Sequence, residues 1–386
     1  IIRDGRLTAN GTTLGGDNGV AVALMLMVLD DDEIEHPPVE CVFTTEEEVG
    51  LNGAKALDKS VLKARTMINM DSEDEGVATV SCAGGLRVQF TKEIQRTTVQ
   101  GSLLTLKVEG LLGGHSGQDI DKERQNADLL MARMIQRLLK ETKGQLVSFN
   151  GGTKDNAIPR ECEASLIYES DEEAAKAEEL ACELAETYAE ELTPAEPDFS
   201  CEISCETNRT AEAIPQDAAK EFICAMRLAP NGIQKRNIKM DGFVVVSLNL
   251  GVVRTEEDRI VMIFSPRSSV ASLQEDTKER LNTLAETFGF TVSHSSEYPG
   301  WSFKEDSPVR EICKESYKEL FGEDLKIEAI HAGLECGLFS DAIKGLDAIA
   351  IGPTIANCHT PDEYLTLDSF ERFYEFLKDI LSRLAK

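Results

Sequence analysis

Four acidic residues occupy similar positions relative to the predicted helices and strands. Asp17, Glu47, Glu48 and Asp71 each follow a predicted strand or precede a predicted helix. In open α/β sheets, ligands bind in the crevice at the carboxyl ends of the strands. Carboxylates that converge there repel one another unless a cation neutralises them. The pattern therefore favours a divalent metal ion, or a pair of ions about 3.5–4 Å apart.

The sequence leaves the roles of Glu47, Glu48 and His359 open. Neighbouring glutamates point in different directions on a regular backbone, so Glu48 could bind a metal while Glu47 faces a water molecule as general base. A run such as Glu46–Glu48 in an acid-rich chain is also typical of solvated surface. His359 lies in a loop after a buried strand, where an unliganded histidine is common, and spacing alone does not connect it to these acids.

The first 84 residues contain longer apolar runs, typical of buried helices, and shorter ones, typical of buried strands. We predict a buried helix without a polar face at 20–29, a buried strand at 39–44, a short helix at 53–57 and a strand at 67–70. Asp17 or Asn18 is placed to cap the first helix. This β–α–β alternation predicts a mostly parallel sheet flanked by helices.

The pattern changes at residue 85 and returns at residue 300. Residues 85–299 mix long alternating strands with amphipathic helices, which predicts an inserted α+β domain made of two halves, like two successive open sandwiches. Its strands are expected at 103–108, 145–149, 243–250, 260–264 and 291–294, and its helices at 124–141, 171–192, 216–228 and 270–288. In residues 300–386 strands and helices alternate again, with helices at 308–321, 336–343 and 367–384 and strands at 326–330 and 348–351. The sequence thus predicts an α/β fold in which residues 1–84 and 300–386 form one domain, interrupted by a second.

Composition excludes several classes of partner. The formal net charge of −29 argues against binding to nucleic acid and to anionic membrane surfaces. No apolar run approaches the roughly 20 residues that span a bilayer. The ten cysteines are scattered, which favours reduced thiols in a cytoplasmic protein. Cys201 and Cys205 are the closest pair, and a structural zinc knuckle there has no second pair to complete it.

Several segments together resemble the M20 metallopeptidases. They occur in family order as Gly11–Gly19, Thr45–Gly50, Asn69–Glu73, Gly352–Thr354 and His359–Glu363. Three further segments are similar to the aminoacyl-histidine dipeptidases, also called peptidase D, namely Gly113–Gly117, Asn156–Arg160 and His331–Gly337. The resemblance implies a zinc-peptidase-like sheet with an inserted lid domain. It also implies a zinc-dependent dipeptidase that hydrolyses carnosine-like Xaa-His dipeptides by metal-activated water, with a small dipeptide as its partner and a homodimer left open.

The resemblance assigns metal ligands and a base. Asp17 would bridge two zinc ions, Glu48 and His359 would complete one site, and Asp71 would bind the other ion. Glu47 would be the general base. The peptide bond between Asp17 and Asn18 is expected to be cis, as is frequent in this family.

The resemblance also suggests residues that bind substrate. His115 of the lid would stabilise the transition-state oxyanion, in its own active site or in a partner's. Arg267 and Asn156 are candidates for holding the substrate carboxylate, and a surface salt bridge is the alternative for Arg267. His331 and Glu335 would line the site or form a packed structural pair.

One family feature has no counterpart in the printed sequence. Members carry a His-x-Asp motif before the bridging aspartate, whereas the 16 residues before Asp17 contain no histidine. We therefore expect the chain to be a fragment that holds at most one zinc ion tightly and has little peptidase activity. Two alternatives stay open, another M20 amidohydrolase (a tripeptidase or an N-acyl amino acid deacylase) and a non-catalytic relative.

Overall fold

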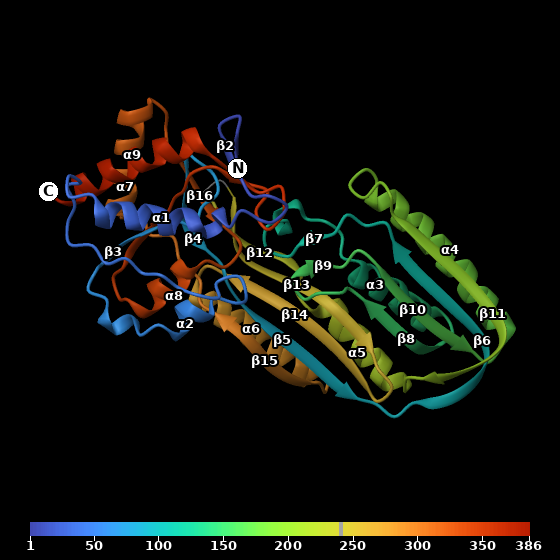
Figure 1. Cartoon of the computed structure of the whole chain (residues 1–386). Coiled ribbons are helices and arrows are strands. Elements are labelled where there is room, and N and C mark those ends of the chain that lie inside the picture. The colour runs from blue at the N-terminus through green and yellow to red at the C-terminus, as the bar shows by residue number, and fades with distance from the viewer. Residues whose placement is uncertain (239–241) are drawn as a thin grey trace. The chain divides into compact units, whose positions relative to one another are not determined.

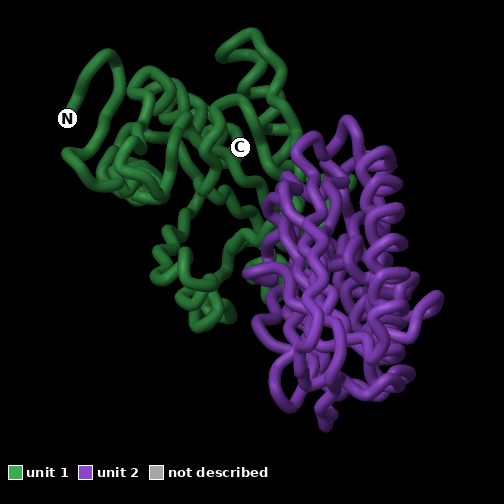
Figure 2. Tube along the Cα trace, turned by 90° about the vertical axis from the view of Figure 1, so that its right-hand side faces the viewer, with its two compact units in different colours: residues 1–83, 299–386 green, residues 84–298 purple. Residues whose placement is uncertain are grey.

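The computed structural model describes residues 1–238 and 242–386, and these fall into two compact units. The first unit combines both ends of the chain, Ile1–Ala83 and Pro299–Lys386, and the second is Gly84–Tyr298 (Figure 2). Each change of unit comes one residue earlier than the change of pattern in the sequence. Among the described residues, no helix combines the length and the apolar character needed to cross a bilayer.

The first unit is built on a sheet in the order β16-β4-β17-β3. Its strands are β3 (Thr66–Asn69), β4 (Val77–Cys82), β16 (Lys326–Ile330) and β17 (Asp347–Ala350). The pairs β16–β4 and β17–β3 are parallel, and only β17–β4 is antiparallel, so the expected mostly parallel sheet is confirmed. Because β3 and β17 are parallel neighbours, the loops that follow Asn69 and Ala350 leave the sheet at the same edge.

A small antiparallel sheet joins the two ends of the chain within this unit. It has the order β1-β2-β19-β18, with β1 (Ile2–Arg3), β2 (Arg6–Thr8), β18 (Ile355–Ala356) and β19 (Tyr364–Thr366). Leu365 pairs with Leu7, and Ile355 pairs with Leu365. The segment before the first helix is thereby fixed beside the loop that carries His359.

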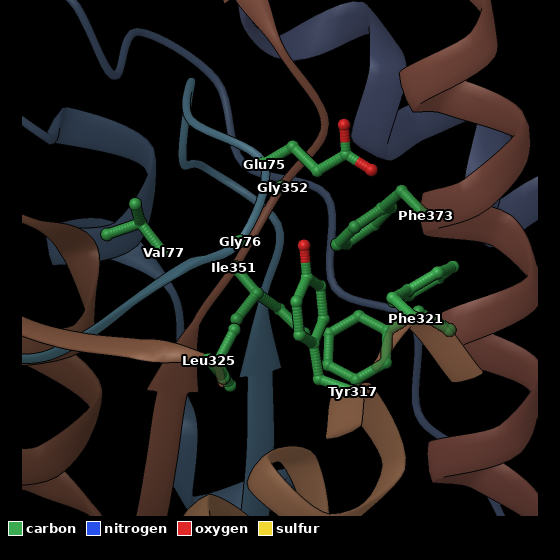
Figure 3. Close-up of a pocket in the computed structure, with 10 residues that line it drawn as sticks. Glu75, Gly76, Val77, Tyr317, Phe321, Leu325, Ile351, Gly352 and Phe373 are labelled. Atoms are coloured by element: carbon green, nitrogen blue, oxygen red, sulfur yellow. The ribbon is translucent and has the colours of Figure 1, made fainter. Parts of the chain in front are cut away.

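The helices of the first unit lie close to their predicted positions. They are α1 (Gly16–Asp30), α2 (Asn52–Ala56), the 3-10 turn η1 (Lys59–Val61), α7 (Pro308–Phe321), α8 (Glu335–Ala342) and α9 (Leu367–Leu384). Helix α7 begins at Pro308, where the missing N–H costs nothing, and Gly322 ends it with φ 77°. Figure 3 shows Tyr317, Phe321 and Phe373 gathered between α7 and α9, and the Tyr317 and Phe321 rings lie 4.8 Å apart.

Two predictions for this unit are wrong. Helix α1 is not buried all round, because Val22, Leu26 and Leu29 are 43%, 54% and 57% exposed. Residues 39–44 are not assigned to a strand of any sheet. Both segments line one apolar groove of about 740 Å³, to which α8 and α9 also contribute side chains. A strand needs a neighbour to complete its hydrogen bonds, and this segment faces the groove instead.

The second unit contains one long antiparallel sheet (Figure 1). Its order is β11-β6-β10-β8-β13-β14-β5-β15, and β12 also pairs with β13. The strands are β5 (Gly84–Glu93), β6 (Thr97–Glu109), β8 (Gln145–Gly151), β10 (Cys162–Tyr168), β11 (Ser200–Ala213), β12 (Gly232–Asn237), β13 (Phe243–Thr255), β14 (Arg259–Ser268) and β15 (Thr291–Tyr298). The expectation of two separate sandwiches is corrected, because the two halves join where Val253 of β13 pairs with Gly151 of β8.

Helices pack on this sheet and complete a single large core. They are α3 (Ala127–Glu141), α4 (Asp171–Leu192), α5 (Gln216–Leu228) and α6 (Ala271–Thr287), with the 3-10 turn η2 (Ile120–Lys122). Asn126 caps α3 by accepting from the N–H groups of Asp128 and Leu129. A short ladder of β7 (Gly114–His115) and β9 (Ala157–Ile158) stands outside the long sheet and carries His115.

Candidate metal centre

An imidazole from the end of the chain lies between two carboxylates from its beginning. The Nε2 atom of His359 is 2.7 Å from Oε1 of Glu48 and 3.0 Å from Oδ2 of Asp17. One ligand atom of each of these three residues lies within 4.8 Å of the others. We call Asp17, Glu48 and His359 the imidazole half of the centre. Carboxylate oxygen and imidazole nitrogen are ligands that zinc accepts, so the donor set fits such an ion.

A tight turn presents the neighbouring glutamates in different directions. Gly53 donates its N–H to the Thr45 carbonyl at 2.8 Å, and a Cβ on Gly53 would lie 2.4 Å from that oxygen, so the position requires glycine. Glu46 has φ 56°, and its side chain accepts from Asn52 at 3.1 Å. Glu46 is thereby held aside, which leaves Glu47 half-buried and Glu48 exposed at the cluster.

Asp71 follows β3 and meets Asp17 through Asn18. The side-chain amide of Asn18 donates to Oδ1 of Asp71 at 3.0 Å, and its carbonyl oxygen accepts from the N–H of Ala21 at 3.1 Å. The expected capping role is therefore confirmed for Asn18. The peptide bond between Asp17 and Asn18 is cis, as expected. Burial, followed by the charges of Asp17 and Glu47, raises the pKa of Asp71 to about 7.

Glu47 and Glu335 add further negative charge beside Asp71. Burial raises the pKa of Glu47, and the nearby Glu48 and Glu335 carboxylates raise it further. The pKa of Glu335, at the start of α8, is also raised by burial. We call Asp71, Glu47 and Glu335 the acid half of the centre. Its raised pKa values show that these carboxylates keep their protons more readily than in water, unless a cation replaces the protons.

The imidazole half behaves in the opposite way. The hydrogen bond to Asp17 raises the pKa of His359, although burial lowers it, and the Glu48 carboxylate raises it further. A positive charge is therefore favoured at Nε2. A proton supplies that charge in the absence of metal, and a divalent cation could supply it instead.

The sequence reasoning missed three groups around this centre. Glu73 and Cys358 lie with Asp17 in a second set whose ligand atoms are within 4.8 Å of one another. Glu363 accepts hydrogen bonds from the backbone before and at Asp17. A glycine-rich loop can point successive backbone N–H groups at a carboxylate, and that signal, together with the acids after His359, could have predicted the Glu363 contact.

The second unit brings His115, Asn156 and Arg267 into one neighbourhood. The ring Nδ1 of His115 accepts from the N–H groups of Gly117 and Gln118 at 3.2 and 3.0 Å. The backbone carbonyl of Asn156 accepts from the N–H of Ser116 at 2.9 Å. Burial lowers the pKa of His115, and the positive charge of Arg267 lowers it further. His115 is thus favoured as a neutral imidazole with its proton on Nε2.

Arg267 and the other histidines occupy varied environments. Arg267 is 7% exposed on β14, and its Nη1 donates to the Tyr298 hydroxyl at 3.0 Å, so its buried position does not fit the surface salt bridge considered as its alternative. His331 is 7% exposed after β16. His36 and His294 are both exposed. Among the described residues, neither Cys201 nor Cys205 belongs to a group that could hold a metal ion.

Comparison with known proteins identifies the architecture. The sequence pattern of peptidase family M20/M25/M40 matches residues 1–383. The chain belongs to this family. It is therefore a hydrolase that acts on peptide bonds.

Two relatives within family M20 resemble nearly the whole chain. The cytosol non-specific dipeptidase of Escherichia coli is 35% identical over 382 residues, which cover 97% of this chain and 78% of the relative. The crystal structure of an aminoacylhistidine dipeptidase from Vibrio alginolyticus superimposes with a TM-score of 0.94 at 35% identity. That match covers 99% of this chain and 78% of that one. The aminopeptidase PepT of Bacillus cereus, 16% identical with a TM-score of 0.52, shares the fold.

Proposed function

We propose that the chain is a zinc-dependent dipeptidase that hydrolyses dipeptides of the Xaa-His type. The observation that carries the proposal is the approach of His359 to Glu48 and Asp17 at 2.7 and 3.0 Å, across more than 300 residues of sequence. The Vibrio alginolyticus relative, described as an aminoacylhistidine dipeptidase, supports the substrate class. The word cytosol in the name of the Escherichia coli relative supports a cytoplasmic location.

The ligands present favour unequal metal binding. Asp17, Glu48 and His359 would hold one zinc ion, whereas Asp17 and Asp71 supply only two ligands to a second. When bound, such an ion lowers the pKa of a coordinated water and polarises the peptide carbonyl. Because zinc in proteins is normally held by three or four protein ligands, we propose that residues 1–386 hold one ion tightly. Two tightly held zinc ions per purified chain, counted by mass spectrometry of the metal, would contradict this.

Glu47 would act as the general base. It would take a proton from the attacking water and deliver it to the leaving amine. A carboxylate serves both steps best when its pKa lies near the working pH, and burial moves the pKa of Glu47 in that direction. Glu335, which shares the acid half, would help to maintain that raised pKa.

Residues of the second unit would bind the substrate. A neutral His115 with its proton on Nε2 offers the donor that an oxyanion requires. Arg267 would bind the substrate carboxylate with its planar guanidinium, and Asn156 would add an amide donor. We also propose that His331 contributes to the substrate site, and that the catalytic chain can form a homodimer.

A substrate panel tests the proposal. The protein, loaded with Zn²⁺, Mn²⁺ or Co²⁺, is incubated with carnosine, Ala-His, dipeptides without histidine, a tripeptide and N-acetyl amino acids. We expect hydrolysis to be slow, because only one ion is held tightly, and the His-containing dipeptides to have the highest kcat/KM. Dipeptides without histidine are needed because the Escherichia coli relative is called non-specific. Preferred cleavage of N-acetyl amino acids or tripeptides would instead favour another M20 amidohydrolase.

A further inference from the structure

One buried carboxylate receives four consecutive backbone N–H groups. Glu363 is 1% exposed. Its Oε2 accepts from Leu14 at 2.7 Å and from Gly15 at 3.0 Å, and its Oε1 accepts from Gly16 at 2.7 Å and from Asp17 at 3.3 Å. All four donors belong to the segment that leads into α1. We call this arrangement the Glu363 clamp.

The backbone of residues 14–17 is shaped to hold an anion. Gly15 has φ 72°, in the left-handed region, which lets successive N–H groups point toward one place. Asp17 and Asn18 have non-helical φ/ψ angles, so the regular turns of α1 begin after Asn18 and the four donors belong to the loop before them. A Cβ added to Gly16 would lie 3.1 Å from Oε1 of Glu363, so this position is fitted closely to the carboxylate.

The clamp connects the two ends of the chain at the metal ligands. Glu363 lies four residues after His359, and the loop between them is closed by the N–H of Glu363 donating to Thr360 and that of Thr360 donating to Asn357. On the other side, one clamp donor is the N–H of Asp17 itself. The clamp therefore fixes the backbone of Asp17 relative to the loop that carries His359.

We propose that Glu363 is a positioning residue that sets the separation of Asp17 and His359 and thereby the metal affinity of the imidazole half. This inference depends on the proposed metal site but not on the proposed substrate. The alternative is a purely structural role, in which the carboxylate only satisfies N–H groups that would otherwise be buried without partners. Outer-shell hydrogen bonds that orient ligands typically change metal affinity by about 10–100-fold when removed, which makes the two roles separable.

The first test replaces the charge and keeps the shape. In Glu363→Gln, the side-chain NH₂ would face backbone N–H groups, so half of the clamp becomes repulsive. We expect Zn²⁺ affinity of the full 386-residue chain to fall about 10–100-fold, measured by competition with a chromophoric chelator. The matched control is Glu75→Gln, because Glu75 is also a shielded carboxylate of the first unit, 14% exposed and held by Arg372. The control should lower the melting temperature but leave Zn²⁺ affinity within about twofold.

The second test disturbs the clamp without removing its charge. The methyl group of Gly16→Ala would press on Oε1 of Glu363, whereas a Cβ at Gly19 of the same helix would meet nothing within 4 Å. We expect Gly16→Ala to weaken Zn²⁺ binding several-fold and Gly19→Ala to leave it unchanged. This pair keeps the inference testable even if Glu363→Gln does not fold.

Three outcomes would overturn the inference. Parent-like Zn²⁺ affinity in folded Glu363→Gln would show that the clamp does not position the ligands. An equal loss of affinity in Glu75→Gln would show that the effect follows general stability. If the parent chain binds no Zn²⁺ at all, the proposed metal site fails as well. If the parent binds Zn²⁺ and the clamp variants bind it with the same affinity, the positioning role fails while the proposed metal site stands.

Discussion

The two halves of the candidate metal centre meet where the charge of Asp17 acts on Asp71, but they differ in solvent access and charge. In the imidazole half, the side chains of Glu48 and His359 are 55% and 62% exposed, and a positive charge on the ring is favoured. In the acid half, burial and mutual repulsion raise the pKa values of Asp71 and Glu47. The comparison teaches that carboxyl groups of the same kind acquire different roles from their surroundings. Those of the imidazole half can serve as metal ligands, whereas those of the acid half retain their protons until a base or a cation displaces them.

The largest effect that separates the halves is expected from Glu47→Gln. The amide cannot accept a proton from water, so hydrolysis of Ala-His should fall about 10²–10⁴-fold, which is the range for loss of a general base. Zn²⁺ affinity should stay close to that of the parent, because the imidazole half keeps all its ligands. Both are measured on one preparation, by steady-state kinetics and by chelator competition. A parallel loss of Zn²⁺ binding would show that Glu47 is a ligand and that the division into halves is wrong.

The next largest effect is expected from His359→Ala, which should do the reverse. It removes the only nitrogen ligand of the imidazole half, and two carboxylates remain. We expect Zn²⁺ affinity to fall at least about 100-fold, because zinc held by two protein ligands is bound weakly. The exposed His36→Ala is a matched control that should bind as the parent does. Retained tight binding in His359→Ala would place the ion elsewhere.

Much of the fold follows from local pattern, whereas the centre depends on contacts that the pattern does not contain. Helices α4, α5, α7 and α9 and strand β16 have the predicted bounds, because apolar periodicity and caps such as Ser170 and Ser307 act within a few residues. The strand expected at 39–44 is absent, because a strand also needs a neighbour to pair with, and the local pattern does not show whether one is present. Glu363 was missed for the same reason, because its four donors lie more than 340 positions away.

The acid half should also show itself in the pH dependence of stability. The pKa of Asp71 is about 7 in the folded chain and 3.8 in its ordinary state, so the folded form binds the proton more tightly. The metal-free protein should therefore lose stability as the pH rises from about 4 to 7, and change little from this group above pH 7. Urea unfolding at several pH values measures this, and Asp71→Asn should remove that part of the slope.

A second buried acid provides an internal reference for that measurement. Burial raises the pKa of Asp128, in the second unit, to about 8. Its contribution should likewise decrease as the pH rises, but it continues to about pH 8 and does not respond to metal. Zn²⁺ should therefore flatten or reverse only the part of the profile that belongs to Asp71. If Zn²⁺ leaves the whole profile unchanged, Asp71 is not near the bound ion.

The smallest effect tests the hydrogen bond by which Asn18 joins α1 to the acid half. Asn18→Ala removes both the donor to Asp71 and the acceptor for the N–H of Ala21, so we expect about 1 kcal/mol less stability and a roughly tenfold loss of kcat. Asn18→Asp keeps the acceptor for Ala21 but places a second carboxylate against Asp71. It should retain the helix cap and still lose kcat, with the metal-free pH profile moved upward because the added charge makes Asp71 harder to ionise. Equal behaviour of the two variants in kinetics and unfolding would assign the whole effect to the lost hydrogen bond to Asp71, whereas a loss in Asn18→Ala alone would assign it to the cap and would leave the geometry of the acid half to β3.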